Sequence, residues 1–151
     1  MIIAIDFDGT IVEHAYPKIG KPIPFAIETL KELQRNGHTL LMWTVREGTL
    51  LQEAIDYVEG KGVKFYAYNK NYPEEDDTKA SRKLNADIFV DDRNVCGFPD
   101  WGTIYRAIQA AEKGAVKFAD VLHAMERENR MPGRKKNFFI RLGEMFDNDG
   151  Y

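Results

Sequence analysis

The chain has 151 residues, 44% of them hydrophobic and 30% charged, which is typical of one globular domain. Its 21 Lys and Arg residues against 24 Asp and Glu residues give a formal net charge of −3, and this balance argues against a general nucleic-acid binder, which carries a basic excess. With one cysteine, Cys96, no intrachain disulfide can form, so a disulfide-stapled secreted scaffold is excluded.

The chain begins with an apolar segment. Residues 2–7 are rich in β-branched side chains, which predicts a strand buried on both faces of a parallel sheet. The apolar start at residues 1–5 lacks a basic flank and is too short for a signal peptide or a membrane span, so we expect a cytoplasmic protein. Residues 13–24 contain three prolines and a glycine and are predicted to form a loop.

Helices and strands then alternate up to about residue 100. Ala26, Leu30 and Leu33 recur at helical spacing. Thr49 and Gln52 fit a capping box at the start of a second helix. The remaining strands are predicted at residues 39–43, 63–68 and 87–90, with a long polar loop at residues 69–79 before the last of them.

From residue 100 onward the apolar spacing is helical. One stripe contains Trp101, Ile104 and Ile108, and a second begins at Phe118. Residues 134–151 are both basic and aromatic, a mixture found in helices that lie on membranes or on partner proteins. We favour packing of this segment on the body of the protein or on a dimer mate over membrane contact.

The alternation of strands and helices predicts an α/β fold, a doubly wound parallel sheet with helices on both faces and a helical C-terminal extension. Ligands of such sheets bind beyond the carboxyl ends of the strands. Asp6 and Asp8 end the first predicted strand, Thr44 ends the second, and Asp91 and Asp92 end the fourth. We therefore expect these side chains to meet at one edge of the sheet.

The four carboxylates at this edge repel one another, so the arrangement requires a cation. Oxygen ligands suit Mg²⁺. Asp6 and Asp8 are two residues apart, so at an extended strand end they face the same pocket. One carboxylate of this pair can attack a phosphorus atom while the other protonates the leaving oxygen.

Three residues near the carboxylates are candidate phosphate ligands. Lys83 lies just before the fourth strand and can neutralise phosphoryl oxygens. Thr44 can hold one of these oxygens through its hydroxyl and its backbone N–H. Arg46 is either a substrate contact or a solvated side chain.

This set of motifs, in this order and at these strand ends, resembles the haloacid dehalogenase (HAD) superfamily of phosphohydrolases. Residues 6–10 match its first motif in full, Thr44 the second, Lys83 the third and residues 88–92 the fourth. The resemblance covers about residues 1–112. It is closest to a group of short, uncharacterised HAD proteins that share the stretches at residues 8–14, 81–84 and 98–101.

The resemblance implies that residues 1–112 are a catalytic domain and residues 113–151 an extension of it. The implied activity is that of a phosphatase acting on a small phosphorylated substrate through an aspartyl-phosphate. Asp6 would be the nucleophile, and Asp8 the general acid and then the base that activates water. Thr44 and Lys83 would stabilise the phosphoryl group.

The resemblance also implies the ligands of the cofactor and the substrate. Mg²⁺ would be held by Asp6, the backbone carbonyl of Asp8 and Asp91, with Asp92 supporting the water shell of the metal. The implied substrate-binding residues are Thr44, Val45, Arg46 and Lys83.

The chain departs from the HAD pattern in two ways. Most members carry a cap domain inserted after the first or third strand, but residues 11–24 and 69–79 are too short for one. We therefore expect a cap-less member whose open site is covered only by loops or by a second subunit in a homodimer. The third motif is also ambiguous, because Lys79 lies four residues before Lys83 and could serve instead.

Other functions are compatible with the same acidic edge. A phosphotransferase would use the same intermediate but an acceptor other than water, and a non-catalytic module would only bind Mg²⁺ and phosphate. A phospho-accepting receiver domain has a similar pocket, but its acidic pair follows the first strand and its lone acceptor Asp the third. The presence of both Asp6 and Asp8 favours catalysis.

Overall fold

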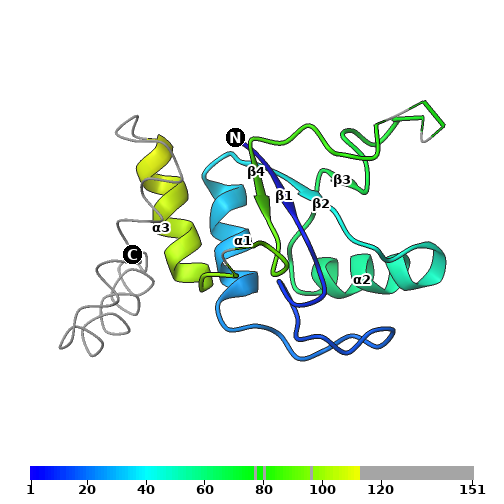
Figure 1. Ribbon diagram of the computed structural model, residues 1–151, viewed down its shortest axis with the longest axis horizontal. Coiled ribbons are helices and arrows are strands. Elements are labelled where there is room, and N and C mark those ends of the chain that lie inside the picture. The colour runs from blue at the N-terminus through cyan, green and yellow to red at the C-terminus, as the bar shows by residue number, and fades with distance from the viewer. Residues whose placement is uncertain (77, 80, 96, 113–151) are drawn as a thin grey trace. The chain divides into compact units, whose positions relative to one another are not determined.

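The computed structural model describes residues 1–76, 78, 79, 81–95 and 97–112 (Figure 1). The chain divides into two units between Phe98 and Pro99. The first unit holds the sheet, and the second contains the helix α3 (Trp101–Glu112). The predicted extension at residues 113–151, with its basic and aromatic segment, lies outside the described residues. None of the described helices is long and apolar enough to cross a membrane.

The first unit is an α/β structure built on a parallel sheet. Its strands are β1 (Ile2–Ile5), β2 (Thr39–Met42), β3 (Ala67–Tyr68) and β4 (Ile88–Val90), in the spatial order β3-β2-β1-β4. Helix α1 (Ala26–Arg35) connects β1 to β2, and α2 (Gly48–Gly60) connects β2 to β3 (Figure 1). The α/β class and the parallel sheet predicted from the sequence are confirmed.

The register places the ends of neighbouring strands side by side. Ile5 of β1 is opposite Met42 of β2 and opposite Val90 of β4. The chain proceeds from β1 outward to β3 and then returns to the other side of β1, so the strand order reverses between β1 and β4. Such a reversal leaves room for a ligand beyond the carboxyl ends of the two strands.

Apolar side chains bury the sheet. Ala4, Leu41, Ala67 and Leu84 form one buried cluster, and Trp43 and Phe89 pack against it with their ring centroids 5.1 Å apart. Buried side chains of α1 complete the core of this unit: Ala26, Ile27, Leu30 and Leu33.

The strands are shorter than predicted. β1 and β2 end where the polar segments begin, whereas β3 starts late because the Val63 N–H still donates to the Val58 carbonyl of α2 at 2.9 Å. The largest difference is in β3, where only Ala67 and Tyr68 pair with β2, whereas the apolar pattern starts at Val63. The predicted capping box is wrong: α2 begins at Gly48, so Thr49 lies inside the first turn, and no side chain caps the helix.

The loop after β1 closes on itself. Val12 bridges Asp8 and Pro22, and the N–H of Glu13 donates to the carbonyl of Lys21 at 2.8 Å. Residues 14–20, which we call the 14–20 loop, extend beyond this closure, as the blue trace after β1 in Figure 1 shows. No helix forms here, as its prolines predict.

The closure of this loop depends on a glycine. A Cβ atom at Gly20 would overlap the backbone carbonyl of Glu13, which cannot move without breaking the pairing beside it. We expect Gly20→Ala to lower the free energy of unfolding by about 1–3 kcal/mol. The matched control is Gly60→Ala, where a Cβ meets nothing within 4 Å and a helix former is gained. Urea unfolding of both variants tests this, and equal stability would contradict the close packing of the loop.

Candidate functional site

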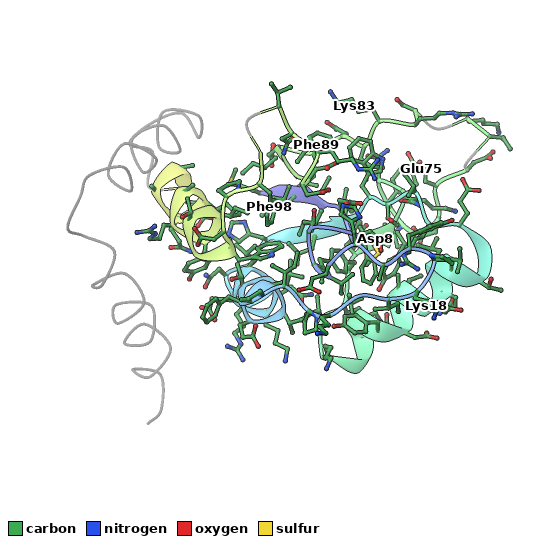
Figure 2. The ribbon with its side chains drawn as sticks, turned by 60° about the horizontal axis from the view of Figure 1, so that its bottom comes forward. Asp8, Lys18, Glu75, Lys83, Phe89 and Phe98 are labelled. Atoms are coloured by element: carbon green, nitrogen blue, oxygen red, sulfur yellow. The ribbon has the colours of Figure 1, made fainter. Side chains whose placement is uncertain are left out.

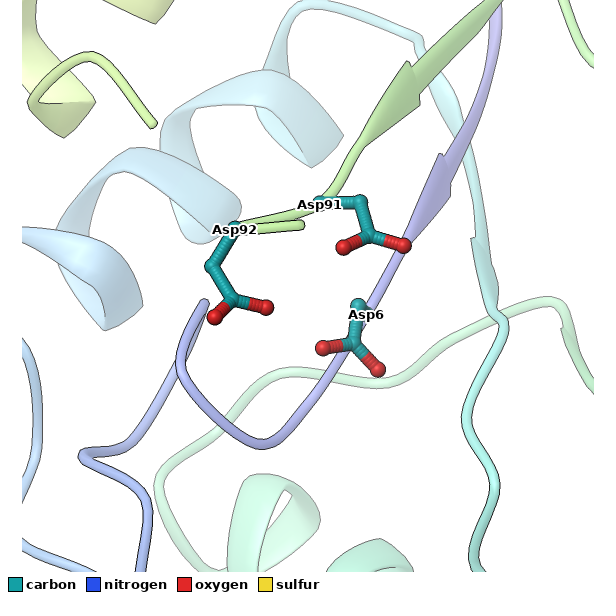
Figure 3. A group of neighbouring side chains, drawn as sticks. All are labelled: Asp6, Asp91 and Asp92. Atoms are coloured by element: carbon teal, nitrogen blue, oxygen red, sulfur yellow. The ribbon is translucent and has the colours of Figure 1, made fainter. Parts of the chain in front are cut away.

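Three carboxylates converge at the edge where the strand order reverses. Asp6 follows β1, and Asp91 and Asp92 follow β4. The N–H of Asp6 donates to the Val90 carbonyl at 2.9 Å, so the sheet ladder continues to the point where these side chains begin. One oxygen from each carboxylate lies within 4.8 Å of the others (Figure 3). The structure thus brings together three of the four predicted acidic residues.

The electrostatics of this cluster affect Asp6 most. Burial raises the pKa of Asp6 to about 7, and the negative charges of Asp91, Asp92 and Asp8 add to the rise. A hydrogen bond from the backbone N–H of Phe7 opposes it. Without a cation, Asp6 is therefore partly protonated at neutral pH.

Asp92 is oriented by the loop after β1. Its backbone N–H donates to Thr10 Oγ1 at 3.1 Å, and its Oδ2 is hydrogen-bonded to His14 Nε2 at 2.8 Å. Gly9, with a φ of 92°, lies against the hydrogen-bonded pair of His14 and Asp92. A Cβ atom at this position would overlap the His14 ring and the Asp92 carboxylate. The glycine of the Asp-Gly-Thr sequence therefore provides both the left-handed turn and the space for this contact.

Asp91 is held by the turn that follows it. Its Oδ1 accepts the backbone N–H of Arg93 at 2.8 Å, and its backbone carbonyl accepts Asn94 Nδ2 at 2.7 Å. The first bond orients the carboxylate without using all of its lone pairs, and the second holds the backbone of the turn.

The donor set of this cluster fits a hard divalent cation. All three groups are carboxylates, which Mg²⁺ prefers over nitrogen or sulfur ligands. Asp92 Oδ1 is buried and has no hydrogen-bond partner among the described residues. A buried carboxylate oxygen without a donor is unfavourable, and a cation beside it would remove that penalty. Asp6, Asp91 and Asp92 could therefore hold Mg²⁺.

The side chain of Asp8 lies outside the cluster and is paired with an arginine. Arg46 Nε donates to Asp8 Oδ2 at 2.6 Å, and Arg46 Nη2 donates to Asp8 Oδ1 at 2.7 Å. Arg46 is 0% exposed and Asp8 is 6% exposed, so both members of the pair are buried. The interpretation of Arg46 as a solvated side chain is wrong, because its guanidinium is buried against this carboxylate.

The segment after β2 is held by Asn69, which follows β3. Asn69 Oδ1 accepts the backbone N–H of Thr44 at 2.8 Å, and Asn69 Nδ2 donates to the Arg46 carbonyl at 3.2 Å. The Thr44 N–H, predicted to hold a phosphoryl oxygen, is therefore bound within the protein. The Thr44 hydroxyl accepts the Arg46 N–H at 3.3 Å and retains its own proton to donate. Val45 is 76% exposed.

The two candidate lysines lie on the connection between β3 and β4. Lys83 Nζ lies 5.4 Å from the centroid of the Phe89 ring, and Figure 2 shows Lys83 at the edge of the molecule, away from Asp8. Lys79 is paired with Asp76 at 3.3 Å, and its side chain is 84% exposed. Within the described part of the chain, no hydrogen bond or ion pair joins either lysine to the acidic cluster.

Three further residues shape the site without having been predicted to do so. Thr10 belongs to the Asp-Gly-Thr sequence, and Asn69 follows a predicted strand, so their positions at the carboxyl edge were available signals. His14 gave no such signal, because its contact with Asp92 joins residues 78 positions apart.

Comparison with known proteins gives one informative relative. No family model and no curated protein matches the chain. A solved structure from Bacteroides thetaiotaomicron, described as a conserved protein, matches with a TM-score of 0.71 and 59% sequence identity. The match covers 80% of this chain and 96% of that protein. Its description states no activity.

The acidic cluster predicts a pH-dependent stability that Asp6 controls. The folded pKa of Asp6, about 7, is above its ordinary value of 3.8, so the metal-free protein loses stability as pH rises from about 4 to about 7. We expect Asp6→Asn to melt at the same temperature as the wild type near pH 4 and several degrees higher at pH 8. Mg²⁺ should raise the melting temperature of the wild type at pH 8 and have little effect on the variant.

The control for this measurement is Asp56→Asn on α2, which removes a carboxylate outside the cluster. Scanning calorimetry with and without Mg²⁺ gives both comparisons. A wild type and an Asp6→Asn variant that respond equally to pH and to Mg²⁺ would exclude Asp6 from the cation site.

Proposed function

This chain belongs to the same family as the conserved Bacteroides thetaiotaomicron protein, and we propose that it is a Mg²⁺-dependent phosphatase of the HAD type. The observation that carries the proposal is the convergence of Asp6, Asp91 and Asp92 at the strand reversal, with Asp8 two residues beyond Asp6. This arrangement supplies a cation site and a nucleophilic carboxylate at one place. The substrate is a phosphate monoester that reaches an open edge of the sheet.

The proposal includes the finer description of the fold. The sheet is a doubly wound sheet of the HAD type, and its reversal lies beside the nucleophile. In this proposal the protein has no cap domain, which the shortness of residues 11–24 and 69–79 supports. Because the 14–20 loop contacts Asp92 through His14, it forms one wall of the substrate site.

The first step transfers the phosphoryl group to the protein. A carboxylate oxygen of Asp6 attacks phosphorus, and the bond from phosphorus to the leaving oxygen breaks. An alkoxide leaving group takes from Asp8 the proton that Asp8 acquired in the preceding turnover; with a stabilised anion such as p-nitrophenolate, Asp8 loses that proton to solvent instead. When bound, Mg²⁺ would neutralise the negative charge of the phosphoryl oxygens and of the carboxylates around them. The Thr44 hydroxyl donates to a phosphoryl oxygen.

The second step releases phosphate. Water attacks the phosphorus of the aspartyl-phosphate, Asp8 accepts a proton from that water, and the bond to the Asp6 oxygen breaks. The Asp6 carboxylate and inorganic phosphate are regenerated. Lys83 or Lys79 would assist both steps if the connection between β3 and β4 brought its ammonium group to the phosphoryl oxygens.

The direct test is phosphate release from p-nitrophenyl phosphate and a panel of small phosphate monoesters, with Mg²⁺ and with EDTA. Turnover should require Mg²⁺. In Asp6→Asn it should fall by roughly 10⁴–10⁶-fold, since the nucleophile is lost. The Asp56→Asn variant should retain full activity, and retained turnover in Asp6→Asn would refute the assigned nucleophile.

The same assay separates the competing functions. A phosphotransferase would give a phosphorylated product when an alcohol acceptor is added, with less inorganic phosphate released. A non-catalytic module would bind Mg²⁺ and phosphate in calorimetry but turn over none of the substrates.

A further inference from the structure

Arg46 is a buried side chain outside the acidic cluster that binds several protein oxygens. Besides the two bonds to Asp8, its Nη1 donates to the Pro17 carbonyl and its Nη2 to the Lys18 carbonyl, both at 2.9 Å. Four hydrogen bonds therefore use most of the five N–H donors of the guanidinium. All four acceptors are protein oxygens, so this group faces inward and not toward an incoming substrate.

The guanidinium is fixed from several directions. Its central carbon lies 5.1 Å from the Phe7 ring centroid and 5.4 Å from that of Tyr16. The backbone of Arg46 is bound by Thr44 and Asn69. The guanidinium, whose N–H donors form a planar fork, is therefore held in one orientation. This orientation sets the plane of the Asp8 carboxylate that accepts from it.

We propose that Arg46 is a positioning residue for Asp8 rather than a ligand of the substrate. This inference rests on the proposed function, because it concerns the proton transfers assigned to Asp8. Both oxygens of Asp8 accept from the fork, yet each carboxylate oxygen retains a further lone-pair site. Arg46 thus directs those remaining sites, while its bonds to Pro17 and Lys18 tie the 14–20 loop to the same group.

The two steps of the reaction depend on this positioning to different extents. When p-nitrophenolate leaves, the bond from phosphorus to its oxygen breaks and the electron pair departs with the anion, which needs no proton at that moment. When water attacks the aspartyl-phosphate, a proton must pass to Asp8 as the bond to Asp6 breaks. Loss of the Arg46 fork therefore slows the second step more than the first.

Rapid-mixing kinetics with p-nitrophenyl phosphate measure the two steps separately. For Arg46→Lys, which keeps the charge but loses the bidentate fork, we expect steady-state kcat to fall by about 10²-fold. An early burst approaching one p-nitrophenolate per protein molecule should appear, because the aspartyl-phosphate accumulates. KM should not rise. The control is Arg35→Lys, whose side chain is 74% exposed on α1 and should leave all three quantities unchanged.

Each other outcome overturns the inference in a recognisable way. A raised KM with no burst would make Arg46 a substrate ligand. A burst rate and a turnover rate that fall together, or a smaller folded fraction by circular dichroism, would reduce its role to stability. A wild type without Mg²⁺-dependent turnover would overturn the proposed function itself, and this inference with it.

Discussion

Parallel pairing of β1 with β4 is the constraint on which the site depends, because it forces like charges together. Both strands end at the same level of the sheet, and each is followed directly by acidic residues. Burial of Asp6 beside Asp91 and Asp92 raises its pKa to about 7. This arrangement is unfavourable in the protein alone and becomes favourable only when positive charge is supplied.

The carboxylates meet this requirement in two ways, at Asp8 and at the acidic cluster. Arg46 neutralises Asp8 inside the fold, with both groups buried. Within the described residues, none of the other three carboxylates pairs with an arginine or a lysine; Asp92 contacts His14 through Oδ2, and its Oδ1 has no hydrogen bond. Their geometry favours an external divalent cation. Asp6 and Asp8 are two positions apart in the sequence, yet Asp8 pairs with Arg46 whereas Asp6 lies in the acidic cluster.

A short loop links the Asp8–Arg46 pair to the acidic cluster. The 14–20 loop contacts Asp92 through His14 and is tied to Arg46 through the carbonyls of Pro17 and Lys18. Gly9 and Gly20 make this compact path sterically feasible. Through these contacts the loop shapes the surroundings of both Asp92 and Asp8.

The sequence by itself determined the α/β class, the parallel sheet and the convergence of Asp6, Asp91 and Asp92, because strand periodicity and strand ends are local signals. Only the tertiary structure decided the partners of the charged groups. Arg46 is 38 positions from Asp8, and burial of this pair follows from how the loops pack. The positions of Lys79 and Lys83 likewise follow from the path of a long connection that no local pattern specifies.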